Sequence, residues 1–226
     1  KKLTPINITL VNNHPDYLRG ALERSLKRLN VNCVDLYYIH RHDGTTPPEE
    51  AFGALMDFKK EGLIRAAGVS NFDLATLQAA SKAGPIDALQ SQYNLLQRDV
   101  EADVLPWCAE NSVSFIPWGP LAYGLLGGRY TRDFKLDDND WRHRSGAFGE
   151  GIFERNMDAV DGLKAIASEC GSTPAHLALQ WLLAQPAVGS VIAGAKNADQ
   201  VSDNVAAENT QVSAEHLAAV DALTKS

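Results

Sequence analysis

The stretch "VDLYYIHRHD" (residues 34–43) carries five apolar or aromatic residues that lead directly into a histidine and then into charged residues. This composition predicts a buried β-strand that ends at His40. Leucines with helical spacing precede it over 15–29, and a second helical pattern follows over 46–62, with Thr46 as its N-cap. The stretch is therefore expected to be a strand between two helices, with a histidine at its carboxyl end.

The same order of strand and helix repeats along the chain. Five apolar runs read as strands, at residues 33–40, 63–72, 87–94, 113–121 and 188–194. Apolar strands with little alternation indicate a parallel sheet covered by helices, and hence an α/β fold. No GxGxxG motif follows any strand, which argues against a dinucleotide-binding doubly wound domain. Two architectures stay open: an open doubly wound sheet, or a (β/α)8 TIM barrel of which three strands are not in this chain.

The domain organisation is expected to be simple. A chain of 226 residues with 45% hydrophobic content can bury a sizeable core as one domain, residues 1–226. The segment 124–152 has glycines, charges and aromatics but no period, which is typical of a lid-like loop within that domain. The chain opens with Lys1 and Lys2 in polar sequence, so the domain is expected to be incomplete at its N-terminus.

Composition excludes several classes of partner. The net charge of -7 argues against binding to nucleic acid or to an anionic membrane surface. The most apolar window, 177–195, is interrupted by Gln180 and Pro186 and is interpreted as a helix and a strand, not a membrane span. No signal peptide is recognisable. Three widely spaced cysteines read as reduced thiols of a cytoplasmic protein: Cys33, Cys108 and Cys170.

Ligands of α/β folds bind at the carboxyl ends of the strands. The residues expected there are mostly neutral hydrogen-bonding groups, with one imidazole, one indole and one lysine, and they include no carboxylate pair for glycoside chemistry. His40 has three interpretations: a core histidine bonded to a backbone carbonyl, a group that polarises a substrate carbonyl, or a metal ligand. The third would enlist His42 and Asp43, although catalytic zinc needs three protein ligands.

Five segments together resemble the aldo-keto reductases. They are "SLKRLNVNCVDLYYIHRHD" (25–43), "EGLIRAAGVSNF" (61–72), "LQSQYNLLQRD" (89–99), "VSFIPWGPLAYGLLGG" (113–128) and "SVIAGAKNADQVSDNV" (190–205). The long loop is similar to that of the bacterial inositol-catabolism and general-stress branch. The resemblance implies a (β/α)8 barrel, here about strands 4–8 with the N-terminal third absent. It also implies NADP(H) binding and reduction of aldehydes or ketones by hydride transfer.

The resemblance also implies roles for individual residues. His40 matches the active-site histidine that orients the carbonyl. The nicotinamide carboxamide would be held by Ser70, Asn71 and Gln90, with Trp118 stacked on the ring and Gly119 and Leu121 at the pyrophosphate. The adenosine and 2'-phosphate end would meet Gly194, Lys196, Asn197, Gln200, Asp203 and Asn204. Gln200 stands where many members carry arginine, so NAD stays open beside NADP.

Three members of the family's catalytic tetrad, an aspartate, a tyrosine and a lysine, precede the histidine in such proteins. No residue of this chain is assigned to them, since Lys1 and Lys2 do not end an apolar strand. Besides a reductase of small carbonyl compounds, two alternatives stay open. One is a non-catalytic nucleotide-binding module like the potassium-channel β subunits, and the other is a metal-dependent hydrolase built on His40 and His42. The sequence does not decide the oligomeric state.

Overall fold

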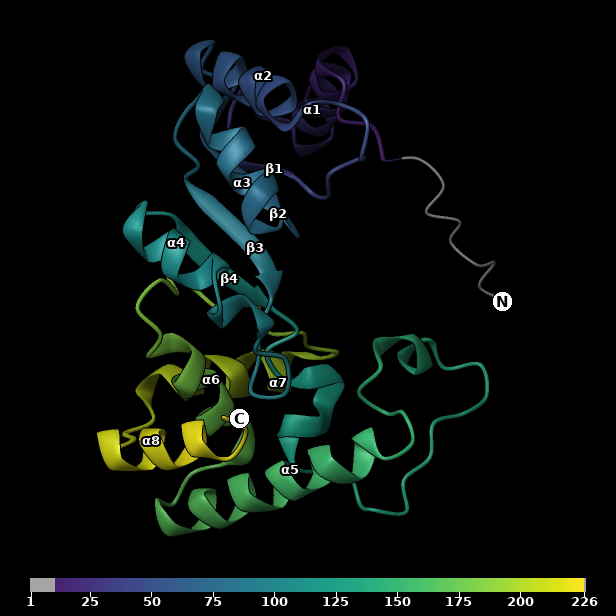
Figure 1. Cartoon of the computed structure of the whole chain (residues 1–226), viewed down its shortest axis with the longest axis vertical. Helices are drawn as coiled ribbons and strands as arrows, with labels where there is room; N and C mark the ends of the chain where they lie inside the picture. Colours follow the sequence, from purple (N-terminus) through teal and green to yellow (C-terminus); the bar gives the residue numbers. More distant parts are fainter. Residues whose placement is uncertain (1–10, 226) are drawn as a thin grey trace. The chain divides into compact units, whose positions relative to one another are not determined.

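A computed structural model describes residues 11–225, so the expectations for Lys1 and Lys2 lie outside the described residues. Its sheet has four strands in the order β1-β2-β3-β4 (Figure 1). The strands are β1 (Val34–Ile39), β2 (Ile64–Ser70), β3 (Ala88–Gln92) and β4 (Ser114–Trp118). β1 pairs in parallel with β2, and β2 in parallel with β3. The predicted α/β class and the first four predicted strands are confirmed.

Helices separate the strands, as the sequence predicts. Those of the first half are α1 (Pro15–Leu29), α2 (Pro48–Lys60), α3 (Leu74–Ala80) and α4 (Val104–Glu110). After β4 come α5 (Ile152–Glu169), α6 (Pro174–Leu183), α7 (Ala198–Ala206) and α8 (Ala214–Ala222). Single 3-10 turns lie at η1 (Ser81–Ala83), η2 (Asp99–Glu101), η3 (Ala122–Gly127), η4 (Trp141–Ser145) and η5 (Ala207–Asn209). None of the helices within residues 11–225 is long and apolar enough to cross a membrane.

The chain divides into two compact units. The first takes in the chain up to Ser91 together with Asp103–Phe115. In it, α2 packs beside α1 and α3 and against β2 (Figure 1). β1 and β2 approach so closely that a Cβ on Gly68 would collide with the ring of Tyr38, its partner in the register. Glycine at 68 therefore makes room for the tyrosine that lies two residues before His40.

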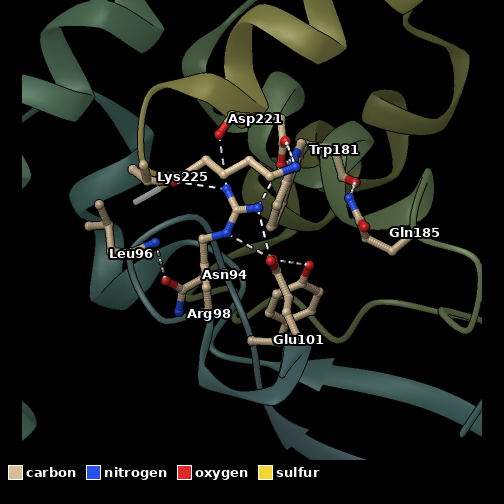
Figure 2. A network of polar contacts seen from close by, with 10 residues as sticks. Asn94, Leu96, Arg98, Glu101, Trp181, Gln185, Asp221 and Lys225 are labelled. Atoms are coloured by element: carbon tan, nitrogen blue, oxygen red, sulfur yellow. Dashed lines mark hydrogen bonds and ion pairs between the residues drawn. The ribbon is translucent and has the colours of Figure 1, made fainter. Parts of the chain in front are cut away.

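The second unit takes in Gln92–Ala102 and Ile116–Ser226. Its helices α5, α6 and α8 contact one another, and the indole of Trp181 on α6 is buried. A polar network anchors α8 to this core (Figure 2). Arg98 donates to both carboxylate oxygens of Glu101 at 2.8 and 3.0 Å, and to Oδ1 of Asp221 at 2.7 Å. Its guanidinium also lies 4.9 Å from the centre of the Trp181 ring, and the side chain is only 14% exposed.

The charges of this network are mutually compensated. Burial raises the pKa of Asp221, but hydrogen bonds from Arg98, Lys225 and the Trp181 indole outweigh it and leave that pKa below its usual value. Tyr93 donates its hydroxyl proton to Glu101 at 2.7 Å, and burial followed by this bond raises the pKa of Tyr93. Arg98 is thus the single cation that two partly buried carboxylates share.

The predicted strand at 188–194 is wrong. This segment makes an isolated parallel bridge in which Ile192 pairs with Trp118, and the Ile192 amide donates to the carbonyl of Pro117 at 3.2 Å. The neighbouring rung of a parallel ladder would need an N–H from residue 117, and proline has none. The run therefore carries isolated bridge residues, Val188 and Ile192, where its composition alone suggested a full strand.

The irregular segment 124–152 is folded around Arg142. The guanidinium makes an ion pair with Asp140 and donates to the hydroxyl of Tyr130, and it lies 5.5 Å from the centre of the Phe148 ring. Phe148 in turn stacks on Phe153 at the start of α5, with ring centres 5.9 Å apart. The segment thus has a small aromatic core of its own, and its role as a lid stays a prediction.

We expect the Arg98→Met variant to lose about 2 kcal/mol of unfolding free energy, because it removes the cation that bonds Glu101 and leaves Asp221 with only the exposed Lys225 as a cation. Urea denaturation followed by circular dichroism measures the shift. Arg132→Met is the matched control, since Arg132 pairs with Asp158 and Asp161 at the surface with 55% of its side chain exposed. Equal midpoints for the two variants would contradict a structural role for the network.

Candidate functional site

The first unit gathers four of the predicted site residues at the carboxyl ends of its strands. His40 directly follows β1 and is exposed, and Ser70 is the last residue of β2 with 1% of its surface exposed. Gln90 lies opposite Ser70 in the register between β2 and β3. Because parallel strands end at the same edge of a sheet, these side chains share one edge.

Asn71 connects the ends of these strands. Its backbone is left-handed, with φ at +58°, a conformation that asparagine tolerates better than most residues. Its Nδ2 donates to the carbonyl of His40 at 3.1 Å and to Oγ of Ser70 at 2.9 Å. Its backbone amide donates to the carbonyl of Gln90 at 2.9 Å. A single residue thus fixes the spacing between the candidate catalytic residue and two residues predicted to hold a carboxamide.

The three interpretations of His40 differ in the surroundings that they require. His40 is exposed in the described chain, which fits a group that meets a substrate better than a core histidine. Within residues 11–225, no group of three histidine, cysteine, aspartate or glutamate side chains is placed to hold a metal ion. The other two members of the supposed metal motif have different partners. The His42 ring bonds the Thr46 carbonyl at 2.9 Å, and Asp43 accepts hydrogen bonds from its own loop and from Asn13.

The second unit carries the predicted pyrophosphate residues on the turn after β4. Trp118 ends β4, and Gly119 follows with φ at +68°, which favours glycine. Asn94 donates its side-chain amide to the Gly119 carbonyl at 2.9 Å. Leu121 then leads into a run of left-handed residues that includes Tyr123, whose hydroxyl accepts a hydrogen bond from Gln92 at 3.2 Å. Nothing in the sequence singled out Asn94, although it lies within one of the family-like segments, residues 89–99.

The remaining predicted residues form one piece at the start of α7. Asn197 is the N-cap, with its Oδ1 accepting from the Gln200 amide at 2.9 Å. Oε1 of Gln200 accepts in return from the Lys196 amide at 2.7 Å. Asn204 donates to the carbonyl of Gly194 at 3.4 Å. The loop before α7 is therefore held by the helix itself.

His176 is a further residue at this end, and nothing in the sequence marked it. It lies near the start of α6, and its Nε2 is 2.9 Å from the carbonyl oxygen of Asp203 and 3.1 Å from its Oδ1. Its Nδ1 lies 3.1 Å from Oγ1 of Thr210. The imidazole therefore bridges α6 to α7 and orients the carboxylate of a predicted cofactor residue.

A model of the aldo/keto reductase family matches residues 2–225. The chain belongs to the aldo/keto reductase family. It is 34% identical over 206 residues to the Schizosaccharomyces pombe protein named aldo-keto reductase yakc, and 34% identical over 218 residues to aldo-keto reductase str7 of Strobilurus tenacellus. These matches cover 90% and 95% of this chain but 61% and 65% of the relatives, so the chain spans less than two thirds of their length.

A solved structure agrees with this membership. The glycerol dehydrogenase AKR11B4 from Gluconobacter oxydans superimposes with a TM-score of 0.89 at 29% identity, over 98% of this chain and 68% of that chain. The described residues thus form part of a (β/α)8 barrel of the aldo/keto reductase type, and the open doubly wound sheet is set aside. The similarity to one bacterial branch stays a prediction.

We expect Asn71→Asp to lose about 1 to 3 kcal/mol of unfolding free energy, because a carboxylate oxygen would replace the amide donor opposite the His40 carbonyl. Urea denaturation measures the loss. Asn30→Asp is the matched control: Asn30 is also left-handed, with φ at +55°, but it is exposed at the end of α1. The control should stay within about 0.5 kcal/mol of the parent. An equal loss in both variants would mean that backbone strain, not the bond to His40, accounts for the effect.

Proposed function

We propose that this chain binds NADP(H) and serves the reduction of aldehydes or ketones to alcohols by hydride transfer. The observation that carries the proposal is the hydrogen bond from Asn71 to the His40 carbonyl. It places a histidine with an exposed side chain directly beside residues whose chemistry fits a nicotinamide carboxamide. Membership in the aldo/keto reductase family supports the same reaction class.

The residues of the first unit fit a carboxamide, which presents both a donor and an acceptor. Oγ of Ser70 accepts from Asn71 and, within the described chain, donates to no acceptor, so its proton can meet a carboxamide oxygen. The Gln90 amide has no hydrogen-bond partner among residues 11–225 and supplies both a donor and an acceptor. Trp118, in the second unit, carries an indole, the kind of side chain on which flat rings stack.

The residues of the second unit fit a phosphorylated nucleoside. The α7 N-terminus favours anions because its first amide groups have no partner within the helix. Lys196 lies directly before this end and is exposed. A Cβ on Gly194 would meet no atom within 4 Å, so a ligand can approach the backbone there. The printed name of the fission yeast relative includes NADP(+), which supports the phosphorylated form of the cofactor for this chain too.

The chain's own residues then have distinct roles. When bound, NADP(H) supplies the hydride. Ser70, Asn71 and Gln90 hold its carboxamide and so fix which face of the ring points to the substrate. The exposed imidazole of His40 donates a hydrogen bond to the substrate carbonyl oxygen, which orients the carbonyl and makes its carbon more electrophilic. None of these residues has the role of proton donor.

The first test is a fluorescence titration of the purified protein with NADPH, followed by an assay of NADPH oxidation with small aldehydes. We expect saturable binding, and turnover that falls by about 100-fold or more in His40→Ala. Intact mass, compared with the 24.5 kDa of this chain, identifies the polypeptide under test. Absence of NADPH binding would overturn the proposal. Binding without turnover would favour the regulatory module only for a polypeptide heavier than the 24.5 kDa of this chain, because this chain has no assigned proton donor.

A second test concerns the choice between NADPH and NADH. We expect Lys196→Gln to weaken NADPH binding by about tenfold and to leave NADH binding unchanged, because only NADPH carries the 2'-phosphate. Lys82→Gln is the control, since Lys82 is an exposed lysine of η1 in the first unit. Equal weakening for both cofactors would place Lys196 away from the 2'-phosphate.

A further inference from the structure

The carboxylate of Asp43, three residues after His40, is fully occupied by hydrogen bonds. Oδ2 accepts from the backbone amide of Asn13 at 2.7 Å and from the side-chain hydroxyl of Thr46 at 2.8 Å. Oδ1 accepts from the amides of Thr45 at 2.9 Å and Thr46 at 2.8 Å. A carboxylate offers about four acceptor positions, and all of them are used here within the protein.

The bond to Asn13 runs in both directions. The Asp43 amide donates to Oδ1 of Asn13 at 2.8 Å, and Asn13 is only 3% exposed. Asn13 lies directly before His14, the N-cap of α1. The pair therefore ties the loop after β1 to the beginning of a helix that is 30 residues away in the sequence.

The same loop is held at two more points. The His42 ring bonds the Thr46 carbonyl at 2.9 Å and meets the buried ring of Phe72 edge-on, with ring centres 5.9 Å apart. On the other side, Asn71 holds the carbonyl of His40 itself. The backbone of 40–46 is thus fixed by contacts on both sides of the histidine.

The side chain of His40 lacks such support. In the part of the chain that the structure describes, the exposed imidazole makes no hydrogen bond, so its position follows from the backbone that carries it. A displacement of about 1 Å at a catalytic group can lower a rate on the order of 100-fold. Whatever fixes the loop after His40 therefore controls where the imidazole meets a carbonyl.

We propose that Asp43 is a positioning residue for His40, and that it acts by locking residues 43–46 to Asn13. The proposal rests on the proposed function, in which His40 orients the substrate carbonyl. It gives a role to the part of "HRHD" that resembled a metal motif: His40 acts on the substrate, whereas His42 and Asp43 hold the loop that presents it.

The charge of Asp43 fits this role. Burial alone would raise the pKa of Asp43, but the hydrogen bonds from Asn13, Thr45 and Thr46 outweigh it and hold that pKa well below its ordinary value. A lowered carboxyl pKa contributes stability above the unfolded value of about 3.9, and this stability is lost as the pH falls through the folded pKa. The lock is therefore intact throughout the neutral range.

The test compares Asp43→Asn with Asp87→Asn. In Asp43→Asn an amide NH2 replaces one acceptor oxygen and faces two donors. In Asp87→Asn a similar carboxylate is altered, one that accepts from the Ala67 amide at 2.8 Å and from Lys59 at 2.7 Å but precedes β3, at the opposite edge of the sheet. We expect kcat to fall by about tenfold or more in Asp43→Asn, with the Kd for NADPH within about twofold of the parent. Asp87→Asn should lose stability and keep kcat.

Hydrogen exchange separates this proposal from the proposed function. If the parent protein turns over no aldehyde, the proposed function fails, yet the lock can still be read from the amides of Thr45 and Thr46. These should lose protection in Asp43→Asn and keep it in Asp87→Asn. If Asp43→Asn does not fold, Asn13→Ala removes one bond of the same lock and should show the same selective loss of kcat. Unchanged kcat together with unchanged protection of these amides would overturn the proposal.

Discussion

Parallel strands cannot be joined by a tight turn, and this constraint shapes the first unit of the structure. Because β1, β2 and β3 are parallel, a crossover helix joins each of them to the next, and all three end at the same edge of the sheet. The loops that leave this edge have no ladder to hold them. Polar side chains hold them instead, since Asn71 binds the end of β1 to β2 and β3, and Asp43 binds the loop after His40 to Asn13. These few hydrogen bonds hold the loops in place, so the loops can position the side chains of the candidate site.

The sequence predicted the fold wherever a pattern was local. The first four strands and the helices between them follow from apolar runs and helical spacing, which depend on neighbours along the chain. It failed where a distant residue decided the outcome. The run at 188–194 has strand composition, but Pro117 on the neighbouring strand withholds an amide. The sequence predicted Thr46 as the N-cap of α2, but its amide and hydroxyl both donate to the Asp43 carboxylate. The N-cap is instead Pro47, which makes no side-chain capping bond.

The site divides in the same way. The position of His40 could be predicted because the end of a strand is visible in the sequence, and the structure places it there with an exposed side chain. Its supporting residues could not be found, because their partners lie far away along the chain. Asp43 looked like a metal ligand until the Asn13 amide accounted for one of its acceptor positions, and His176 gained meaning only from its contact with Asp203. Residue type shows what a side chain can do, but only its neighbours show what it is occupied with.

The hydrogen-bond partners of Gln200 bear on the choice of cofactor. The side-chain Oε1 of Gln200 accepts from the backbone amide of Lys196, and the backbone amide of Gln200 donates to Oδ1 of Asn197. This arrangement is close to a capping box. An arginine has no acceptor and could not close this pair of bonds. The glutamine therefore adds rigidity to the loop before α7 but contributes no charge. Under the proposed function, a preference for a 2'-phosphate at this end would rest on Lys196 and on the partial positive charge of the α7 N-terminus. Gln200 orders this loop but lacks the positive charge of an arginine at the same position. We therefore expect discrimination between NADP(H) and NAD(H) to be weaker than an arginine would give.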